Sequence, residues 1–317
     1  SNRINSTKLV NLYFHILRDD DGTNASFTKE EVKIKFDSLV AKYRNANICF
    51  NLLGIDRIDN TTLNKEQNFE NGLESLFFNP LIGPAFADYD IAHCINVYFI
   101  TSHRGDDFGG LARGIPGNAC VVQNKDVAYT LPHEIGHCLG LFHTFTKNGG
   151  EENIDGSGCN DKGDKCCDTE ADPYSYIENS CFSVDENDDC SYTGSCEDPR
   201  GNTNWNPPFN NMMSYWECYE KNKIFTPDQA NLMHTTLQEY NVLSGVQNLD
   251  NVTVNDQNFT NGIHVWNGNN LETTGTNNLT NVGSYFLTGR KIIINPGFRA
   301  SPSGSGQTRI ISNFACE

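Results

Sequence analysis

Residues 133–143, which read H-E-I-G-H-C-L-G-L-F-H, constrain this chain more than any other segment. Positions four apart lie on one face of an α-helix, so we expect His133 and His137 to point the same way. Gly140 can adopt the positive φ that ends a helix and turns the chain back, which would bring His143 to the other two. The segment therefore predicts a helix, a turn and a cluster of three imidazoles.

Three imidazole nitrogens form a ligand set for zinc and leave one position of the tetrahedron open, as in catalytic rather than structural zinc sites. Glu134 lies about 100° around the helix axis from His133, which places it within reach of a water molecule without making it a ligand. A helix with surface histidines would explain a bare H-E-x-x-H, but it does not explain all five residues at this spacing. The motif predicts one catalytic zinc ion, with Glu134 activating the attacking water.

The segment resembles the zinc-binding signature of the metzincin metallopeptidases. Downstream, Asn211-Met212-Met213-Ser214-Tyr215 resembles the N-x-M-x-Y form of the methionine turn that lies beneath the zinc in that family. By this resemblance Met213 is the turn methionine. Tyr215 either stabilises the oxyanion of the reaction or packs against the zinc helix, and both roles stay open at this point.

Within the metzincins the likeness is to the pappalysin and cytophagalysin group, and it covers about residues 8–243. It is carried by His143-Thr144-Phe145, by Cys167-Asp168-Thr169-Glu170 and by Phe225-Thr226-Pro227-Asp228-Gln229. The resemblance implies a zinc endopeptidase that acts on proteins or peptides, with calcium near Asp164, Asp168 and Thr169. Glu170, where the family often has proline, and the long cysteine-rich loop before the methionine turn depart from the family pattern.

Two further expectations concern the substrate. Gly110, Leu111 and Ala112 lie in a segment that reads as an edge strand, which could receive an extended substrate by strand addition. Relatives in the pappalysin group often cleave next to Arg or Lys, and Glu217 or Glu220 could offer a negative charge to such a side chain. Either glutamate could equally be a solvated loop residue.

The order of periodic segments predicts an α+β fold, metzincin-like, with a twisted mixed sheet, helices, a zinc helix and an irregular lower subdomain. Strands are expected at 9–17, 48–58, 91–100 and 109–122, helices after Thr28, at 126–139 and at 226–240, and an irregular stretch at 147–208. Beyond residue 245, short runs such as HVW and KIIINPGF indicate an all-β module. We therefore expect a catalytic domain at residues 1–244 and a small β module at residues 245–317.

Cysteine content and charge bear on the compartment and the partners. Eight of the twelve cysteines lie between Cys138 and Cys218, which favours disulfide-stapled loops and a secreted or cell-surface protein. No C-x2-C pair supports a cysteine-rich zinc cluster instead. The formal net charge of −17 argues against a nucleic-acid partner. No apolar run is long enough for a transmembrane segment, and a signal peptide is lacking, as expected of a mature form.

The rival to the peptidase is a binding or adhesion protein on an inactive metzincin scaffold. In that reading the C-terminal β module carries the function, and it could attach the protein to a cell surface. A lost zinc ligand would favour this alternative. All three histidines and Glu134 are present, which favours the enzyme.

Overall fold

The structure is a computed structural model. It describes residues 7–65, 86–101, 109–123, 127–185, 188–216 and 222–243, and after these residues 252–255, 258–259, 263–274, 277–280, 284–296, 298–301 and 308–311. The fold is α+β, as predicted, with a mixed five-stranded sheet and helices. Within the described ranges, none of the helices combines the length and the apolar composition that crossing a membrane requires.

The five-stranded sheet has the order β2-β1-β3-β5-β4. Its strands are β1 (Lys8–Arg18), β2 (Ile48–Asp59), β3 (Ile95–Ile100), β4 (Gly110–Ala112) and β5 (Ala119–Gln123). All neighbours pair in parallel except β4, which runs antiparallel to β5. The strand β4 is therefore at the edge of the sheet that the described residues form.

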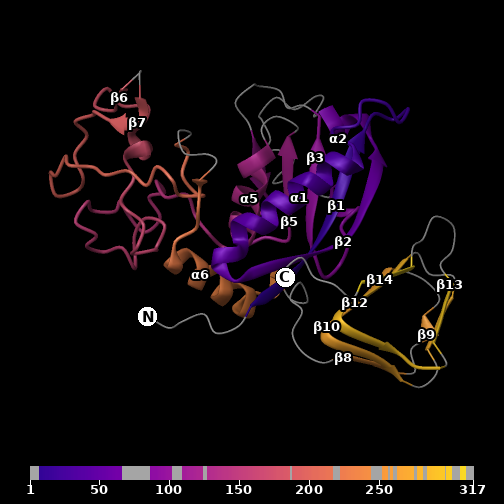
Figure 1. Cartoon of the computed structure of the whole chain (residues 1–317). Helices are drawn as coiled ribbons and strands as arrows, with labels where there is room; N and C mark the ends of the chain where they lie inside the picture. Colours follow the sequence, from indigo (N-terminus) through magenta and orange to yellow (C-terminus); the bar gives the residue numbers. More distant parts are fainter. Residues whose placement is uncertain are drawn as a thin grey trace.

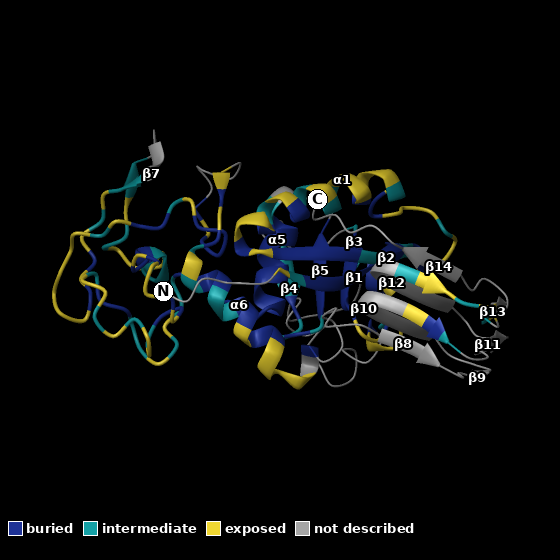
Figure 2. Ribbon diagram, turned by 60° about the horizontal axis from the view of Figure 1, so that its bottom comes forward, coloured by how far each residue is buried: buried dark blue, intermediate teal, exposed yellow. Residues whose placement is uncertain are grey.

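Two helices, α1 (Lys29–Tyr43) and α5 (Val127–Cys138), pack against each other beside this sheet (Figure 1). Helix α1 begins at a capping box formed by Thr28 and Glu31. The alternate β1 residues Val10, Leu12, Phe14 and Ile16 belong to the same buried cluster as residues of both helices. Figure 2 shows the sheet largely buried, while the outer sides of the helices are exposed. This apolar layer fixes α5, which carries the first two histidines.

Three short helical elements and one longer helix complete this part of the chain. They are α2 (Thr61–Lys65), the 3-10 helices η1 (Arg44–Ala46) and η4 (Asn241–Leu243), and α6 (Pro227–Glu239). Thr226 and Gln229 form a capping box at the start of α6, and Pro227 takes the first helical position. The helix therefore begins where the sequence predicted.

Between α5 and α6 the chain is mostly irregular, as predicted. Its regular elements among the described residues are the 3-10 helix η2 (Pro173–Tyr176) and a small hairpin of β6 (Val184–Asp185) and β7 (Asp188–Tyr192). Disulfides join Cys159 to Cys167 and Cys181 to Cys196. Cross-links of this kind stabilise a stretch that has little periodic structure of its own.

The strands after residue 250 form two parallel sheets. One has the order β14-β12-β10-β8 and the other β13-β11-β9. Their bounds are β8 (Val252–Asn255), β9 (Asn258–Phe259), β10 (Ile263–Thr274), β11 (Asn277–Thr280), β12 (Ser284–Ile294), β13 (Phe298–Ser301) and β14 (Thr308–Ile311). In Figure 1 these strands and the β6–β7 hairpin lie on opposite sides of the five-stranded sheet. The all-β character of this region agrees with the sequence prediction.

Two local predictions were wrong. Residues 109–122 form two antiparallel strands rather than one, because Gly114, Pro116 and Gly117 turn the chain between β4 and β5. The third strand begins at Ile95 rather than Ile91, since a turn precedes it. The adjacent cysteines also differ, since Cys167 is cross-linked to Cys159 whereas Cys166 is a buried free thiol.

Candidate metal centre and active site

The three histidines of the motif come together at the end of α5. Their Nε2 atoms lie 3.1 Å (His133 to His137), 3.0 Å (His137 to His143) and 3.1 Å (His133 to His143) apart. His133 and His137 lie one turn apart on the helix, and Gly140 follows it with a φ of 94°. That left-handed backbone returns the chain so that His143 faces the other two, as the sequence predicted.

Hydrogen bonds orient two of these imidazoles. The Nδ1 atom of His133 is 2.8 Å from the carbonyl oxygen of Met212, and Nδ1 of His137 is 2.7 Å from that of Leu141. A carbonyl oxygen only accepts, so Nδ1 carries the proton in both rings. The Nε2 lone pairs therefore point at one another, an arrangement that calls for a cation between them.

The histidine cluster fits zinc. Two zinc–nitrogen bonds of about 2.0–2.1 Å at the tetrahedral angle place the nitrogens about 3.3 Å apart, close to the observed spacing. Burial lowers the pKa of His137 to about 4 and holds the pKa values of His133 and His143 well below their ordinary value. The neutral imidazole that binds metal is thus the favoured form. Of the residues that the structure describes, these three alone form a group of at least three His, Cys, Asp or Glu ligand atoms within 4.8 Å of one another.

Glu134 lies beside the cluster and is 5% exposed. Its Oε2 atom has no hydrogen-bond partner in the described part of the chain. Burial raises the pKa of Glu134 to about 8, although a hydrogen bond from the Ala112 backbone opposes the shift. A β-carbon on Gly110 would lie 2.6 Å from Cγ of Glu134, so the edge strand β4 packs directly against this side chain. The edge strand and the carboxylate therefore share one site.

The methionine turn lies beneath the zinc helix, where the resemblance implied. Met213 is fully buried, and its Sδ atom would lie 2.6 Å from a β-carbon on Gly136. The amides of Asn211 and Gln229 exchange two hydrogen bonds of 3.1 Å, which ties the turn to the start of α6. The Thr144 amide donates to the Met213 carbonyl at 3.2 Å. The turn thus supports both the zinc helix and the segment of the third histidine.

Tyr215 follows the methionine turn and is 45% exposed. Its ring centroid lies 4.7 Å from that of His143 and 5.7 Å from that of His133. Burial of the hydroxyl region raises the pKa of this tyrosine, and the charge of Glu134 raises it further. Tyr215 therefore stays protonated at neutral pH and can donate a hydrogen bond beside the histidines.

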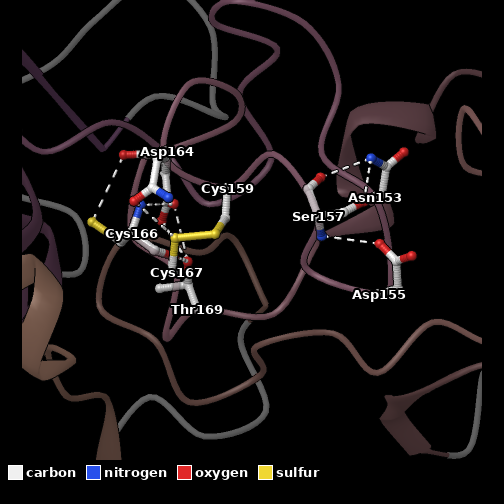
Figure 3. The surroundings of a disulfide bond; sticks show 9 residues. Asn153, Asp155, Ser157, Cys159, Asp164, Cys166, Cys167 and Thr169 are labelled. Carbon is white, nitrogen blue, oxygen red and sulfur yellow. Dashed lines mark hydrogen bonds between the residues drawn. A yellow bond between two sulfur atoms is a disulfide. The ribbon is translucent and has the colours of Figure 1, made fainter.

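The three residues implied for calcium do not all converge. Figure 3 shows Asp164 and Thr169 together beside the Cys159–Cys167 disulfide. The Thr169 hydroxyl lies 3.0 Å from both carboxylate oxygens of Asp164. The Asp168 carboxylate instead accepts a 2.9 Å hydrogen bond from the Asp228 amide at the start of α6. Asp168 thus serves as an acceptor at a helix end.

The sequence reasoning missed Glu152, which lies near Asp164. Its Oε2 atom is buried without a hydrogen-bond partner among the described residues and would lie 2.7 Å from a β-carbon on Gly163. Burial raises the pKa of Glu152 to about 8, and the charge of Asp164 raises it further. Burial likewise raises the pKa of Asp164 to about 7. This pair of buried carboxyl groups lacks a compensating positive charge in these contacts.

The sequence reasoning also missed Asp172. Asp172 accepts hydrogen bonds from Thr144 and Trp216, which directly follow His143 and Tyr215. Contacts across 28 and 44 residues of irregular chain leave no periodic signal in the sequence.

Glu217 and Glu220, the candidates for substrate preference, lie outside the described residues.

Comparison with known proteins agrees with this geometry. Residues 118–238, which include the three histidines, Glu134 and Met213, match the peptidase family described as pregnancy-associated plasma protein-A. This match and the relatives named below support a metzincin-type zinc metallopeptidase of the pappalysin family. The pappalysin match thus begins just before β5 and ends within α6.

Relatives of this chain are named metalloproteases. The "Extracellular metalloprotease" of Arthroderma benhamiae is 27% identical over 187 residues, which are 53% of this chain and 57% of that protein. The "Extracellular metalloprotease" of Colletotrichum graminicola is 26% identical over 255 residues, 74% of this chain and 78% of that protein. The chain thus spans little more than half the length of the first of these relatives. Among solved structures, metalloproteinase-II from Bacteroides fragilis overlaps 46% of each chain at 14% identity, with a TM-score of 0.31.

Proposed function

We propose that this chain is a zinc-dependent endopeptidase that hydrolyses peptide bonds in proteins or peptides. One observation carries the proposal: three Nε2 atoms within 3.1 Å of one another lie beside a buried glutamate whose Oε2 has no partner among the described residues. His133, His137 and His143 would hold the zinc ion. Zinc, when bound, supplies Lewis-acid chemistry that acidifies water and polarises a carbonyl group.

Glu134 is the proton carrier of this mechanism. Its unpartnered Oε2 can accept a proton from the attacking water and then deliver that proton to the leaving nitrogen. Burial favours the protonated form of the free carboxyl group, so a positive charge at the histidine cluster would adjust its pKa toward the ionised base. Glu134 thereby acts as base and then as acid in one turnover.

The edge strand and Tyr215 orient the substrate in this proposal. The outer side of β4 (Gly110–Ala112) can pair with an extended substrate strand, and main-chain hydrogen bonds of this kind tolerate many side chains. Tyr215 remains protonated and lies near His133 and His143, so its hydroxyl can stabilise the oxyanion. A preference for a basic side chain, through Glu217 or Glu220, remains a proposal on sequence grounds.

The proposed localisation of the protein is extracellular. Two disulfides staple the irregular region, and the relatives are named extracellular metalloproteases. The alternative, an adhesion protein on an inactive scaffold, is not favoured, because no zinc ligand is lost. No observation on the described residues supports cell-surface attachment through the β module.

The proposed boundary between the catalytic domain and the β module lies at residues 244–245. The strands β1 to β5 form the mixed sheet beside the site, and the strands after the boundary form parallel sheets of their own. Limited proteolysis followed by mass spectrometry tests the boundary. Cleavage between residues 243 and 252, with both products resistant to further cutting, is expected, whereas first cuts inside β10 or β12 would contradict it.

Calcium near Asp164 and Thr169 is a further part of the proposal. The buried carboxylates of Asp164 and Glu152 call for a compensating cation, and oxygen ligands suit calcium. Asp168, committed to the start of α6, is not expected to be a ligand through its side chain. Calcium should raise the melting temperature of the zinc-loaded protein, and Glu152→Gln should reduce this effect. An equal calcium response in both proteins would remove Glu152 from the site.

Metal dependence tests the proposed activity. The purified protein should bind one zinc per chain, measured by atomic emission, and cleave denatured casein. Removal of the zinc by a chelator should abolish cleavage, and one equivalent of zinc should restore it. His137→Ala should lose both the bound zinc and the activity. Stoichiometric zinc without cleavage of any protein or peptide substrate would favour the binding-protein alternative.

A further inference from the structure

One buried carboxylate links two segments of the site that are distant in the sequence. Asp172 is 5% exposed, and both of its oxygens accept hydrogen bonds. Oδ2 accepts from the Thr144 hydroxyl at 2.6 Å, while Oδ1 accepts from the Trp216 indole at 3.0 Å and from the Tyr174 amide at 3.0 Å. The three donor groups thus meet at one side chain.

Two of these donors directly follow residues of the site. Thr144 is next to His143, and Trp216 is next to Tyr215. Both donor side chains are buried, with exposures of 2% for Thr144 and 4% for Trp216. The carboxylate therefore holds the segment of the third histidine and the segment after the methionine turn at a fixed distance from each other.

The linked segments also touch each other at the site. The ring of Tyr215 lies 4.7 Å from the ring of His143, between their centroids. Phe145 stacks on His143 from the same segment, with ring centroids 4.7 Å apart, and its centroid is also 4.7 Å from that of Tyr215. A shift of either segment would therefore change the position of the histidine relative to the tyrosine.

Burial of the Asp172 carboxylate costs free energy, which suggests that this side chain is present to position its hydrogen-bond partners rather than to fill space. A buried carboxylate loses its hydration, and apolar residues of similar volume often stabilise a protein at least as well. Oδ2 of Asp172 bonds to the segment of Thr144, and Oδ1 bonds to the segment of Trp216, so the direction of each bond is fixed. Directed contacts of this kind fix the geometry of a site and of its metal ligands.

We propose that Asp172 is a positioning residue, which fixes His143 relative to Tyr215 by bonding to Thr144 and Trp216. The inference rests on the proposed zinc peptidase function. It assigns to Asp172 a role in orienting the third ligand and the tyrosine, without contact to substrate or metal.

The test compares Thr144→Val, Thr144→Ser and Asp172→Ala in the full chain. Thr144→Val removes the hydroxyl that donates to Asp172, Thr144→Ser keeps it, and Asp172→Ala removes the acceptor for both segments. Asp198→Ala is the matched control: Asp198 is also a buried carboxylate that accepts several N–H groups, from Ile154, Arg200 and Asn202, but it bonds to neither segment.

Zinc affinity and the visible spectrum of the Co²⁺-substituted protein are the primary measurements, since neither requires peptidase activity. Partners that orient a ligand typically contribute about 10- to 100-fold in metal affinity or activity. Thr144→Val and Asp172→Ala should therefore weaken zinc binding by about tenfold and shift the Co²⁺ absorption bands. In kinetics, kcat should fall by about tenfold with little change in KM. Thr144→Ser and Asp198→Ala should retain the parent spectrum and affinity.

A parent spectrum and a parent zinc affinity in Thr144→Val would overturn the proposal, even if the melting temperature falls. If Asp172→Ala does not fold, the spectrum and the zinc affinity of Thr144→Val decide the proposal on their own. A parent protein that binds Co²⁺ but cleaves nothing would contradict the peptidase function alone, because the spectral comparison would still decide the role of Asp172.

Discussion

The Sδ atom of Met213 occupies the space that a side chain at position 136 would need, 2.6 Å from where a β-carbon on Gly136 would stand. Met213 lies in the methionine turn, and Gly136 lies between the two histidines of α5. The turn therefore supports the zinc helix by direct packing against its backbone. A glycine is needed at position 136 because the Met213 side chain approaches its backbone closely, and not because the backbone has a positive φ.

Gly136→Ala should reveal this packing. The added methyl group overlaps the thioether, and overpacking of this kind typically costs about 1–3 kcal/mol of unfolding free energy. Met213→Ala should cost about 2–5 kcal/mol by leaving a cavity. The double variant should lose less than the sum of the two, because the smaller side chain at 213 makes room for the methyl group. Denaturant unfolding measures all three, and strictly additive losses would contradict the contact.

Gly110→Ala should reduce catalysis without removing zinc. Its β-carbon would lie 2.6 Å from Cγ of Glu134 and 2.9 Å from the Val121 carbonyl oxygen, so either the carboxylate or the edge strand must move. Misplacement of a catalytic group by about 1 Å can cost about 10²-fold in rate. The measurement is kcat/KM at equal zinc content.

Gly109→Ala is the neighbouring control for that experiment. Its β-carbon would meet the end of the Thr130 side chain at 3.1 Å, a contact that a small movement relieves. A much smaller loss of kcat/KM is expected. Equal losses in the two variants would show that the strand, rather than the contact with Glu134, is what the substitution disturbs.

The cross-link between Cys181 and Cys196 should contribute to stability. It closes a loop with a sequence separation of 15, for which chain entropy predicts about 3 kcal/mol. Replacing both cysteines with alanine should lower the unfolding free energy by about 2–4 kcal/mol in denaturant unfolding. Cys166→Ala, which removes a buried free thiol but no cross-link, should cost less. A larger loss in Cys166→Ala would contradict this account.

Acid should loosen the region around Asp198 in a defined pH range. Burial raises the pKa of Asp198, but four hydrogen bonds from Asn202, Ile154 and Arg200 outweigh it and lower the pKa from its ordinary value of 3.8 to about 2. The stability contributed by a carboxylate with a lowered pKa is fully present above pH 3.8 and is lost as the pH falls toward 2. The protection of the Ile154 and Asn202 amides against hydrogen exchange, relative to the intrinsic rate at each pH, should therefore fall over this range, and Asp198→Asn should flatten the dependence. An unchanged pH profile in Asp198→Asn would assign the effect to other groups.

The helices and the histidine cluster follow from local sequence, whereas the supports of the site do not. Thr28 and Thr226 open helices because their capping residues lie three positions downstream, and Gly140 turns the chain because it lacks a β-carbon. These signals act within a few residues. The bonds from Asp172 to Thr144 and Trp216 join segments of irregular chain, where no periodicity marks which residues meet.

Turn chemistry explains one of the wrong predictions. The Gly114-Ile115-Pro116-Gly117 segment between β4 and β5 contains a strong turn signal, but the apolar residues on both sides read as one continuous strand. The edge position of β4 emerges only from its antiparallel pairing with β5. The free edge beside Glu134 is therefore a tertiary feature.

Hydrolysis of a peptide or of casein by Glu134→Gln with one equivalent of bound zinc tests whether Glu134 is the proton carrier of a zinc peptidase. The substitution keeps the size of the side chain and the three histidines but removes the group that accepts and returns the proton. Glu134→Gln should bind zinc fully and lose kcat by at least about 10²-fold, while Glu239→Gln at the exposed end of α6 should retain parent activity. Parent-like cleavage by zinc-loaded Glu134→Gln would contradict this role.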